Sequence, residues 1–327
     1  MPNRMTRRRL LASAGLTTAA ATLIGCQGTW SSAKGQSGGT GARRSLRLAH
    51  LTDVHVQPEK RAPEGFAACL RHAQGLADPP QLILNGGDCI LDCFTTDAER
   101  ARTQWEVWQR VLAAECHLPV IHCLGNHDIW GWDKASARTT GDEERFGKRW
   151  ALEEFGVERH YRSFDRDGWH FIVLDSTSSD GGNYYFARLD DEQFAWLEED
   201  LARLAGARPV VVLSHIPILS AASFFDGENE KPGDWVVPRA WMHIDARRIK
   251  DLFLKHPNVR LCLSGHLHLV DRVEYCGVTY ICDGAVCAGW WDGPYQECWP
   301  GYGVVDLYED GSFSHEYVQF GWEFEQS

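Results

Sequence analysis

The alternation of short apolar runs with helix-like stretches constrains the fold of this chain more than any other feature. Six apolar runs have the length and composition of buried strands, and a stretch with helical spacing of apolar residues lies between successive runs. This alternation is typical of α/β architecture. We expect strands at 46–51, 82–84, 120–124, 171–174, 210–213 and 259–263, and helices at 65–76, 97–114, 144–155, 190–204 and 245–255.

The pattern changes after residue 268. Four runs (272–275, 279–282, 304–308 and 313–320) alternate around turns at Gly277 and at Asp310-Gly311, which predicts antiparallel hairpins. The chain has 327 residues, and no internal repeat or linker follows Arg44. We therefore expect residues 45–327 to form a single domain of the α/β (α+β) class.

The first 25 residues have the character of a targeting segment. Residues 7–9 are arginines, and a charge-free apolar run over 10–25 follows them, too short to span a bilayer comfortably as a helix. The pattern resembles a twin-arginine export signal. The sequence up to Cys26 resembles a bacterial lipobox, in which that cysteine is lipidated and becomes the new N-terminus. The alternative is a frayed amphipathic helix at the N-terminus.

A Gly/Ser-rich tether over residues 26–44 separates this segment from the expected domain. We expect export to the periplasm or another extracytoplasmic compartment, with a lipid anchor in a membrane of the cell envelope. No second apolar run is long enough to cross a bilayer, so contact with the membrane is expected only through that anchor.

Charge and cysteine content exclude several classes of protein. Lys and Arg number 33 against 45 Asp and Glu, a net charge of −12, so no nucleic-acid-binding surface is expected. None of the 11 cysteines forms a C-x-x-C pair, which argues against a zinc ribbon or a thioredoxin-like motif. An envelope location permits disulfides, but the spacing does not determine how the cysteines would pair.

Side chains capable of metal binding follow five of the six expected strands. Residues just beyond the carboxyl ends of such strands converge on one crevice. Carboxylate, amide and imidazole donors without thiolate are the ligand set of Zn, Mn or Fe hydrolytic centres. Any one block is a weak signal, since a lone G-D or D-x-H is common, but all five in order are a strong signal. The blocks are Asp53-Val54-His55, Gly87-Asp88, Gly125-Asn126-His127-Asp128, Ser214-His215 and Gly265-His266-Leu267-His268.

This ordered set resembles the calcineurin-like metallophosphoesterases over residues 45 to about 284. The resemblance implies a calcineurin-like four-layer α/β/β/α sandwich with mixed central sheets, and two divalent metal ions (Mn, Fe or Zn). It assigns Asp53, His55 and His268 to one metal, Asn126, His215 and His266 to the other, and Asp88 to both as a bridge.

His127 then corresponds to the family's general acid. Many members orient that histidine with an Asp three residues after the bridging one, but here position 91 is Leu and the nearest candidate is Asp92. Asp92 or Asp128 is expected to support His127.

The expected function is metal-dependent hydrolysis of a phosphodiester or a small phosphomonoester. Two divalent ions clamp the phosphoryl group, and a metal-bridging hydroxide attacks phosphorus in line. The partner is thus a small phosphorylated substrate. Two alternatives are a non-catalytic metal- or phosphate-binding envelope lipoprotein and a dinuclear metal amidohydrolase. The presence of His127 and Asp88 disfavours the first, and the position of H-x-H in the last block disfavours the second.

Aromatic residues near the motifs suggest what the site accepts. Trp130 follows His127 by three residues, and Trp291 belongs to a Gly/Pro-rich stretch that also holds Trp290, Tyr295 and Trp299. Packing within the loops is one interpretation of these rings. The other is an aromatic wall, with Trp130 and Trp291 binding the organic group of the substrate.

Overall fold

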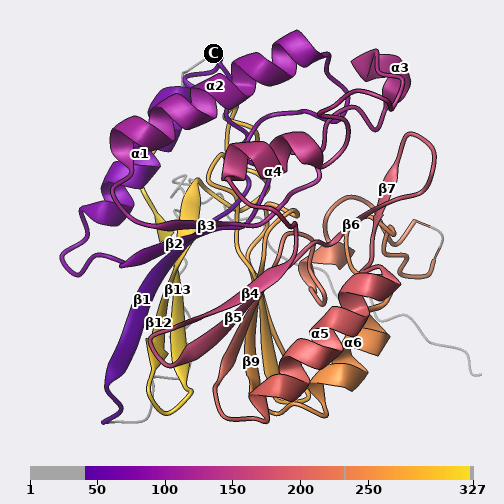
Figure 1. Ribbon diagram of the computed structural model, residues 1–327. Helices are drawn as coiled ribbons and strands as arrows, with labels where there is room; N and C mark the ends of the chain where they lie inside the picture. Colours follow the sequence, from indigo (N-terminus) through magenta and orange to yellow (C-terminus); the bar gives the residue numbers. More distant parts are fainter. Residues whose placement is uncertain (1–40, 232, 325–327) are drawn as a thin grey trace, which may run out of the picture. The chain divides into compact units, whose positions relative to one another are not determined.

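Two mixed β-sheets face each other, and helices cover the outer side of each sheet (Figure 1). The computed structural model of the chain describes residues 41–231 and 233–324. These residues all belong to one compact unit, Lys34–Ser327. The segment expected to be a signal over 1–25, Cys26 and nearly all of the expected tether lie outside the described residues.

The first sheet has five strands, with parallel pairing at its centre and antiparallel pairing at one side. β1, β2 and β3 are parallel, whereas β12 is antiparallel to β1 and β13 to β12. In spatial order the strands are β13 (Phe313–Gln319), β12 (Gly301–Tyr308), β1 (Arg44–Leu51), β2 (Leu82–Asn85) and β3 (Val120–His122).

The second sheet has six strands. Its four inner strands are parallel to one another, and each edge strand is antiparallel to its neighbour. In spatial order they are β10 (Asp271–Tyr275), β11 (Val278–Cys282), β9 (Val259–Ser264), β8 (Val210–Ser214), β5 (Trp169–Leu174) and β4 (Arg162–Arg166). A separate hairpin joins β6 (Thr177–Ser179) to β7 (Tyr185–Ala187).

Several helices begin where a capping side chain or a proline favours it. The Asp97 carboxylate accepts a hydrogen bond from the backbone of Arg100 at the start of α2, and Asp190 caps α5 in the same way. The helices are α1 (Ala62–Gln74), α2 (Ala98–Glu115), α3 (Lys134–Ala137), α4 (Arg149–Phe155), α5 (Asp191–Leu204) and α6 (Ala246–Phe253), with a short 3₁₀ turn η1 (Ala222–Phe224).

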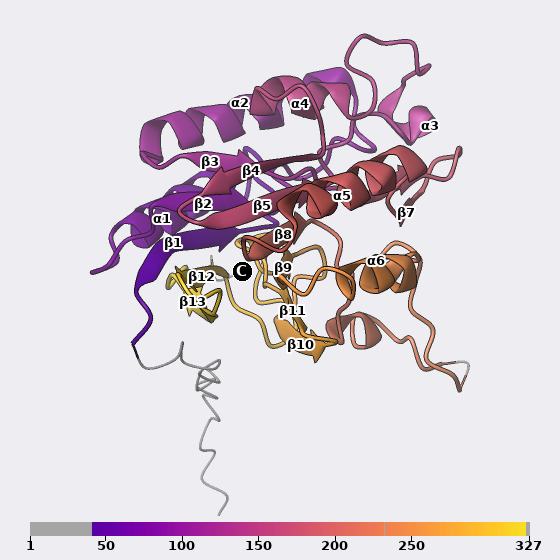
Figure 2. The same ribbon diagram turned by 60° about the horizontal axis from the view of Figure 1, so that its bottom comes forward.

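Alternation along the strands produces the layers, because successive side chains point to opposite faces of a sheet. In β1, Leu48 packs between the two sheets, whereas Leu51 packs with residues of α1 and α2. In β8, Val211 packs between the sheets and Val212 packs with residues of α5 and α6. The result is a four-layer α/β/β/α arrangement, with α1 and α2 on one outer face and α5 and α6 on the other (Figure 2).

The predicted fold class is confirmed, and all ten predicted strands are present. The helix expected over 144–155 is shorter in the structure, where it begins only at Arg149. Gly147 just before it has a φ of 72°, and its backbone pairs with Trp130 instead of continuing a helix. β4 was not predicted, because its sequence RSFDR has no apolar run. Its edge position explains this composition, since an edge strand tolerates charged side chains.

Within residues 41–231 and 233–324, no helix combines the length and the apolar composition needed to cross a bilayer. The cysteines in this part of the chain are free thiols, and nearly all are buried; they are Cys69, Cys89, Cys93, Cys116, Cys123, Cys262, Cys276, Cys282, Cys287 and Cys298.

Candidate metal centre

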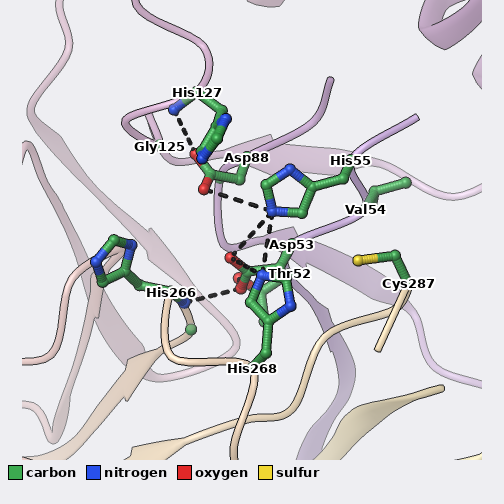
Figure 3. A network of polar contacts seen from close by, with 12 residues as sticks. Thr52, Asp53, Val54, His55, Asp88, Gly125, His127, His266, His268 and Cys287 are labelled. Atoms are coloured by element: carbon green, nitrogen blue, oxygen red, sulfur yellow. Dashed lines mark hydrogen bonds and ion pairs between the residues drawn. The ribbon is translucent and has the colours of Figure 1, made fainter. Parts of the chain in front are cut away.

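The five motif blocks lie at the carboxyl ends of β1, β2, β3, β8 and β9. Three of these strands belong to the first sheet and two to the second, so the blocks approach one another from both sheets. Figure 3 shows several of the side chains that meet there, among them Asp53, Asp88 and His268. Parallel strands place their carboxyl ends at one edge, and this explains why residues far apart in the sequence come together.

Many of the donor residues have left-handed backbone conformations, which orient their side chains toward the site. This conformation is uncommon for residues other than glycine, although Asp and His adopt it more readily than most. Backbone hydrogen bonds hold the turns, since the Asp53 N–H donates to the Gly87 carbonyl at 3.0 Å and the His55 N–H to the Asp88 carbonyl at 3.0 Å. The φ angles are 54° at Asp53, 45° at His55, 53° at Asp88, 72° at His266 and 57° at His268.

One cluster of donors consists of Asp53, His55 and His268. The two Nε2 atoms of His55 and His268 lie 3.1 Å apart, and Asp53 Oδ1 is 3.8 Å from the first and 3.5 Å from the second. The Nδ1 atom of each ring faces a backbone carbonyl, that of Leu91 at 3.4 Å and that of Ala288 at 2.6 Å. These carbonyls hold the hydrogen on Nδ1, so Nε2 is the atom available to a ligand.

A second cluster consists of Asp88, Asn126, His215 and His266. The His215 Nε2 atom lies 3.2 Å from Asp88 Oδ2 and 3.1 Å from Asn126 Oδ1. Ligand atoms of Asp88, His215 and His266 all lie within 4.8 Å of one another. Asp88 Oδ2 is also 3.7 Å from the Nε2 atom of His55. Asp88 therefore stands between the two clusters.

The charge state of these groups suits a cation site. Burial and a neighbouring histidine lower the pKa of His55 to about 3 and that of His266 to about 3. Burial opposes the charged form of His215, but Asp88 outweighs it and raises the pKa of His215 to about 9. Burial also opposes charge on Asp53 and Asp88, yet the surrounding histidines hold the pKa of both carboxyls below the usual range. Burial also opposes charge on His268, yet Cys287 and Asp53 raise its pKa. Ionised carboxylates and neutral imidazoles are the forms that bind metal, so a cation would displace the proton from His215 and from His268.

The residues present fit a pair of divalent cations. Asp53 Oδ1 is buried, and among the described residues it has no hydrogen-bond partner. An ionised oxygen in this position is costly unless a cation satisfies it. The donor set of carboxylate, amide and imidazole also suits ions such as Zn²⁺, Mn²⁺ or Fe.

Two glycines allow the strand ends to approach this closely. A Cβ atom at Gly265 would lie 2.1 Å from Thr52 Oγ1 and 2.2 Å from Asp53 Oδ2. A Cβ atom at Gly125 would lie 2.1 Å from both the backbone nitrogen and Oδ1 of Asp88. Any larger residue at either position would displace a carboxylate of the clusters.

His127 lies at the opening of the site, with its side chain 31% exposed. Its backbone N–H donates to Asp88 Oδ1 at 2.7 Å, and its ring contacts the ring of His55 edge-on at 4.8 Å. Asp92 Oδ1 lies 3.8 Å from His127 Nδ1, and the same carboxylate accepts a hydrogen bond from the Phe94 backbone at 2.8 Å.

Asp128 faces away from His127 and supports the loop of Asp88 instead. Its carboxylate accepts hydrogen bonds from the backbone N–H groups of Asp88 at 3.0 Å, Cys89 at 2.8 Å and Gly125 at 2.9 Å. Burial and the charge of Asp88 raise the pKa of Asp128 to about 6. Of the two expected partners for His127, only Asp92 is therefore near it.

The structure corrects the prediction for Trp130 and Trp291. Both are core residues, with 5% and 3% of their surface exposed. The Trp130 indole N–H donates to the Thr96 carbonyl at 3.1 Å, and that of Trp291 donates to the Val54 carbonyl at 2.9 Å. Burial and these hydrogen bonds leave neither ring free to face a substrate.

Other aromatic rings lie beside the metal centre. The Trp290 ring is 4.6 Å from the ring of His268, and Tyr185 on β7 is 6.2 Å from the ring of His266. Both side chains are partly exposed. Tyr184 stacks on Tyr185 at 5.3 Å. The sequence had no signal that distinguished Trp290 from Trp291; the left-handed φ angles of 53° and 70° at these two positions point them in different directions.

Comparisons with known proteins agree with this geometry. The family model of calcineurin-like phosphoesterases matches residues 46–270. A 3',5'-cyclic-nucleotide phosphodiesterase of Nostoc sp. is 22% identical over 282 residues, which are 82% of this chain and 90% of that protein. The 3',5'-cyclic adenosine monophosphate phosphodiesterase of Escherichia coli is 22% identical over 284 residues, 83% of this chain and 88% of that protein.

Among solved structures, a dimetal phosphatase from Danio rerio has a similar fold. Its TM-score is 0.58 at 14% identity, covering 85% of this chain and 97% of that one. The match to a phosphoesterase model argues against the alternatives of an amidohydrolase and of a non-catalytic binding protein. With its motif blocks gathered at one edge of the two sheets, the chain belongs to the calcineurin-like phosphoesterase family and is a hydrolase acting on phosphoric ester bonds.

Proposed function

We propose that this protein is a dinuclear metal-dependent phosphodiesterase whose substrate carries an aromatic organic group such as a nucleobase. The observation that carries the proposal is the position of Asp88 between two donor clusters, with His127 beside it. The similarity to two cyclic-nucleotide phosphodiesterases supports the choice of a diester over a monoester.

Each donor cluster would hold one cation, and Asp88 would contribute to both. Asp53, His55 and His268 are the remaining protein donors of the first site, and Asn126, His215 and His266 those of the second. When bound, two divalent cations supply positive charge for the phosphoryl oxygens and acidify a water molecule. This acidic chain needs such a source of positive charge for a phosphate ester.

His127 is positioned to hold a proton at the leaving group. Its ring is partly exposed at the opening of the site, while its backbone bond to Asp88 keeps it beside the clusters. A proton on the ring can pass to the departing alkoxide oxygen, which is a poor leaving group when unprotonated. Asp92 Oδ1, 3.8 Å from His127 Nδ1, helps to orient the ring.

Two aromatic rings flank the metal clusters where an organic group would project. Trp290 lies on the side of His268 and Tyr185 on the side of His266. Stacking on such a ring contributes about 1–3 kcal/mol per nucleobase, which is roughly five- to 150-fold in affinity. A nucleoside phosphodiester therefore fits this opening better than a small aliphatic phosphate does.

Steady-state kinetics of the metal-loaded protein test the proposal. We expect hydrolysis of 3',5'-cyclic AMP and bis(p-nitrophenyl) phosphate, with a KM clearly below that for glycerol phosphate. Trp290→Leu and Tyr185→Leu should raise KM for cyclic AMP by about five-fold or more and change kcat little. Trp299→Leu is the control, since Trp299 is 47% exposed and contacts Phe324. A wild-type KM for cyclic AMP in both test variants would refute the role of Trp290 and Tyr185 in substrate binding. Metal-loaded protein that hydrolyses neither diester would refute the proposed phosphodiesterase activity.

We also propose that the protein is exported and lipid-anchored through Cys26. The support is the pattern of residues 7–26, all of which lie outside the described residues. The tether up to residue 44 would separate the anchor from the catalytic domain.

A further inference from the structure

Cys287 lies at the first donor cluster. Its Sγ, a ring nitrogen of His55 and a ring nitrogen of His268 all lie within 4.8 Å of one another, and the residue is fully buried. In Figure 3 the sulfur of Cys287 points toward these two imidazoles. The sequence offered no sign of this, because an isolated cysteine between apolar residues is typical of a core position.

Backbone contacts hold Cys287 in place against the first motif block. The Cys287 N–H donates to the Asp53 carbonyl at 3.3 Å, and the preceding Val286 N–H donates to the Thr52 carbonyl at 3.0 Å. The Trp291 N–H donates to the carbonyl of Cys287 at 3.0 Å. The next residue, Ala288, accepts the hydrogen bond from His268 Nδ1. The loop that carries the thiol is therefore the same loop that orients one of the imidazoles.

The first cluster has donors that the protein itself does not satisfy. The buried Asp53 Oδ1 has no hydrogen-bond partner in the described part of the chain. Within the described residues, the Cys287 thiol lies 3.5 Å from the Ala288 carbonyl and beside the His268 imidazole. The Asp53 oxygen and the Cys287 sulfur thus each lie near the imidazoles of His55 and His268, and these groups come from three separate segments of the chain.

We propose that the Cys287 thiolate is a ligand of the metal in the first site, together with Asp53, His55 and His268. The inference rests on the proposed function, because it assumes a cation at this cluster. Binding of the cation displaces the thiol proton to solvent. Thiolate is a soft ligand, so the first site would prefer Zn²⁺, Co²⁺ or Fe over Mn²⁺, while the second site keeps the harder donors of Asn126 and Asp88.

Cobalt substitution of the protein tests separately whether the centre binds metal and whether the Cys287 thiolate is one of the ligands. A Co²⁺ ion bound to thiolate has an intense charge-transfer band in the near ultraviolet, whereas the visible bands of Co²⁺ report occupancy with any ligand. We expect both kinds of band in the wild type. Cys287→Ser should lose the charge-transfer band and keep the visible bands. Cys69→Ser is the matched control, because Cys69 is equally buried but lies in α1 among apolar residues.

Each outcome separates this inference from the proposed function. Wild-type protein that binds cobalt without a charge-transfer band would overturn the role of Cys287 and leave the dinuclear centre standing. Protein that binds no cobalt and no zinc would overturn both. If Cys287→Ser does not fold, zinc-edge X-ray absorption of the wild type still decides, since a sulfur at about 2.3 Å from zinc is expected. Scattering from nitrogen and oxygen alone would contradict the proposal.

Metal preference gives a second measurement. In competition with a chelator, Cys287→Ser should bind Zn²⁺ at the first site at least about 10-fold more weakly, with a smaller change for Mn²⁺. Equal losses for both ions would show that the substitution merely disturbs the site, and would count against a thiolate ligand.

Discussion

A single methyl group at position 265 should disable the first metal site. In Gly265→Ala the new Cβ would lie 2.1 Å from Thr52 Oγ1 and 2.2 Å from Asp53 Oδ2, closer than side chains tolerate. Asp53 Oδ2 accepts hydrogen bonds from the Thr52 hydroxyl at 2.6 Å and from the His266 N–H at 2.9 Å. Both bonds must lengthen or break when the carboxylate moves.

The size of the effect follows from these contacts. Overpacking of a buried site costs about 1–3 kcal/mol, and weakening two hydrogen bonds to a carboxylate adds about 1–3 kcal/mol. We expect the free energy of unfolding of the metal-free protein to fall by about 2–6 kcal/mol. Displacement of a ligand should also weaken metal binding at the first site by about 10–100-fold.

Urea unfolding of chelator-treated protein and elemental analysis of zinc-loaded protein measure the two effects. Gly293→Ala is the control: a Cβ there would meet nothing within 4 Å, and Gly293 is outside the residues with positive φ. It should leave stability unchanged or raise it by up to about 1 kcal/mol. Wild-type stability and full zinc content in Gly265→Ala would refute the argument that close packing of residue 265 positions Asp53.

The remaining predictions concern catalysis, targeting and acid stability. His127→Ala should keep both metals and lose about 10²–10⁴-fold in kcat for alkyl esters, but less for p-nitrophenyl esters, whose leaving group needs no proton; equal losses for the two ester types would exclude an acid role. Replacing Arg7 and Arg8 together by Lys should leave the protein in the cytoplasm, whereas Cys26→Ser should permit export without lipid, and fractionation with a lipid label checks both. Burial opposes the charge of Asp175, but Lys148 outweighs it and lowers its pKa from 3.8 to about 2. The ionised carboxylate thus stabilises the fold above about pH 4, and this contribution disappears as the pH falls to about 2. The stability difference between wild type and Asp175→Asn should shrink over that range, and a constant difference would contradict the assignment.

The fold and the ligand positions were largely predictable because both depend on local patterns. Buried parallel strands such as β8 are continuous apolar runs, and a donor placed directly after a strand must lie at the sheet edge. The assignment of Asp53, His55 and His268 to one cluster came from the family resemblance, and the structure places them together. Their roles as ligands remain predictions until a metal is measured.

Side-chain direction in the long loops was not predictable. Trp290 and Trp291 are adjacent, yet one contacts His268 and the other enters the core. Cys287 comes 19 residues after His268 in the numbering, and only the fold returns its loop to the first block. Asp128 belongs to a recognised motif, but its three backbone partners became visible only when the separate turns were in place.

Selection for heat resistance alone would act against this metal centre. Asp53, His55, Asp88, His266 and His268 all have positive φ angles, a backbone conformation that costs roughly 1 kcal/mol for a residue with a Cβ and that glycine adopts freely. Glycine at any one of them would relax the backbone and delete a donor. Laboratory evolution of this chain for thermal survival, without a screen for hydrolysis, should therefore favour glycine at His266, whose side chain is only partly buried. Glycine at Asp53 or Asp88 would in addition lose the hydrogen bonds of a buried carboxylate. Asp and His at these positions thus lower the stability of the backbone while they provide the donors of the site.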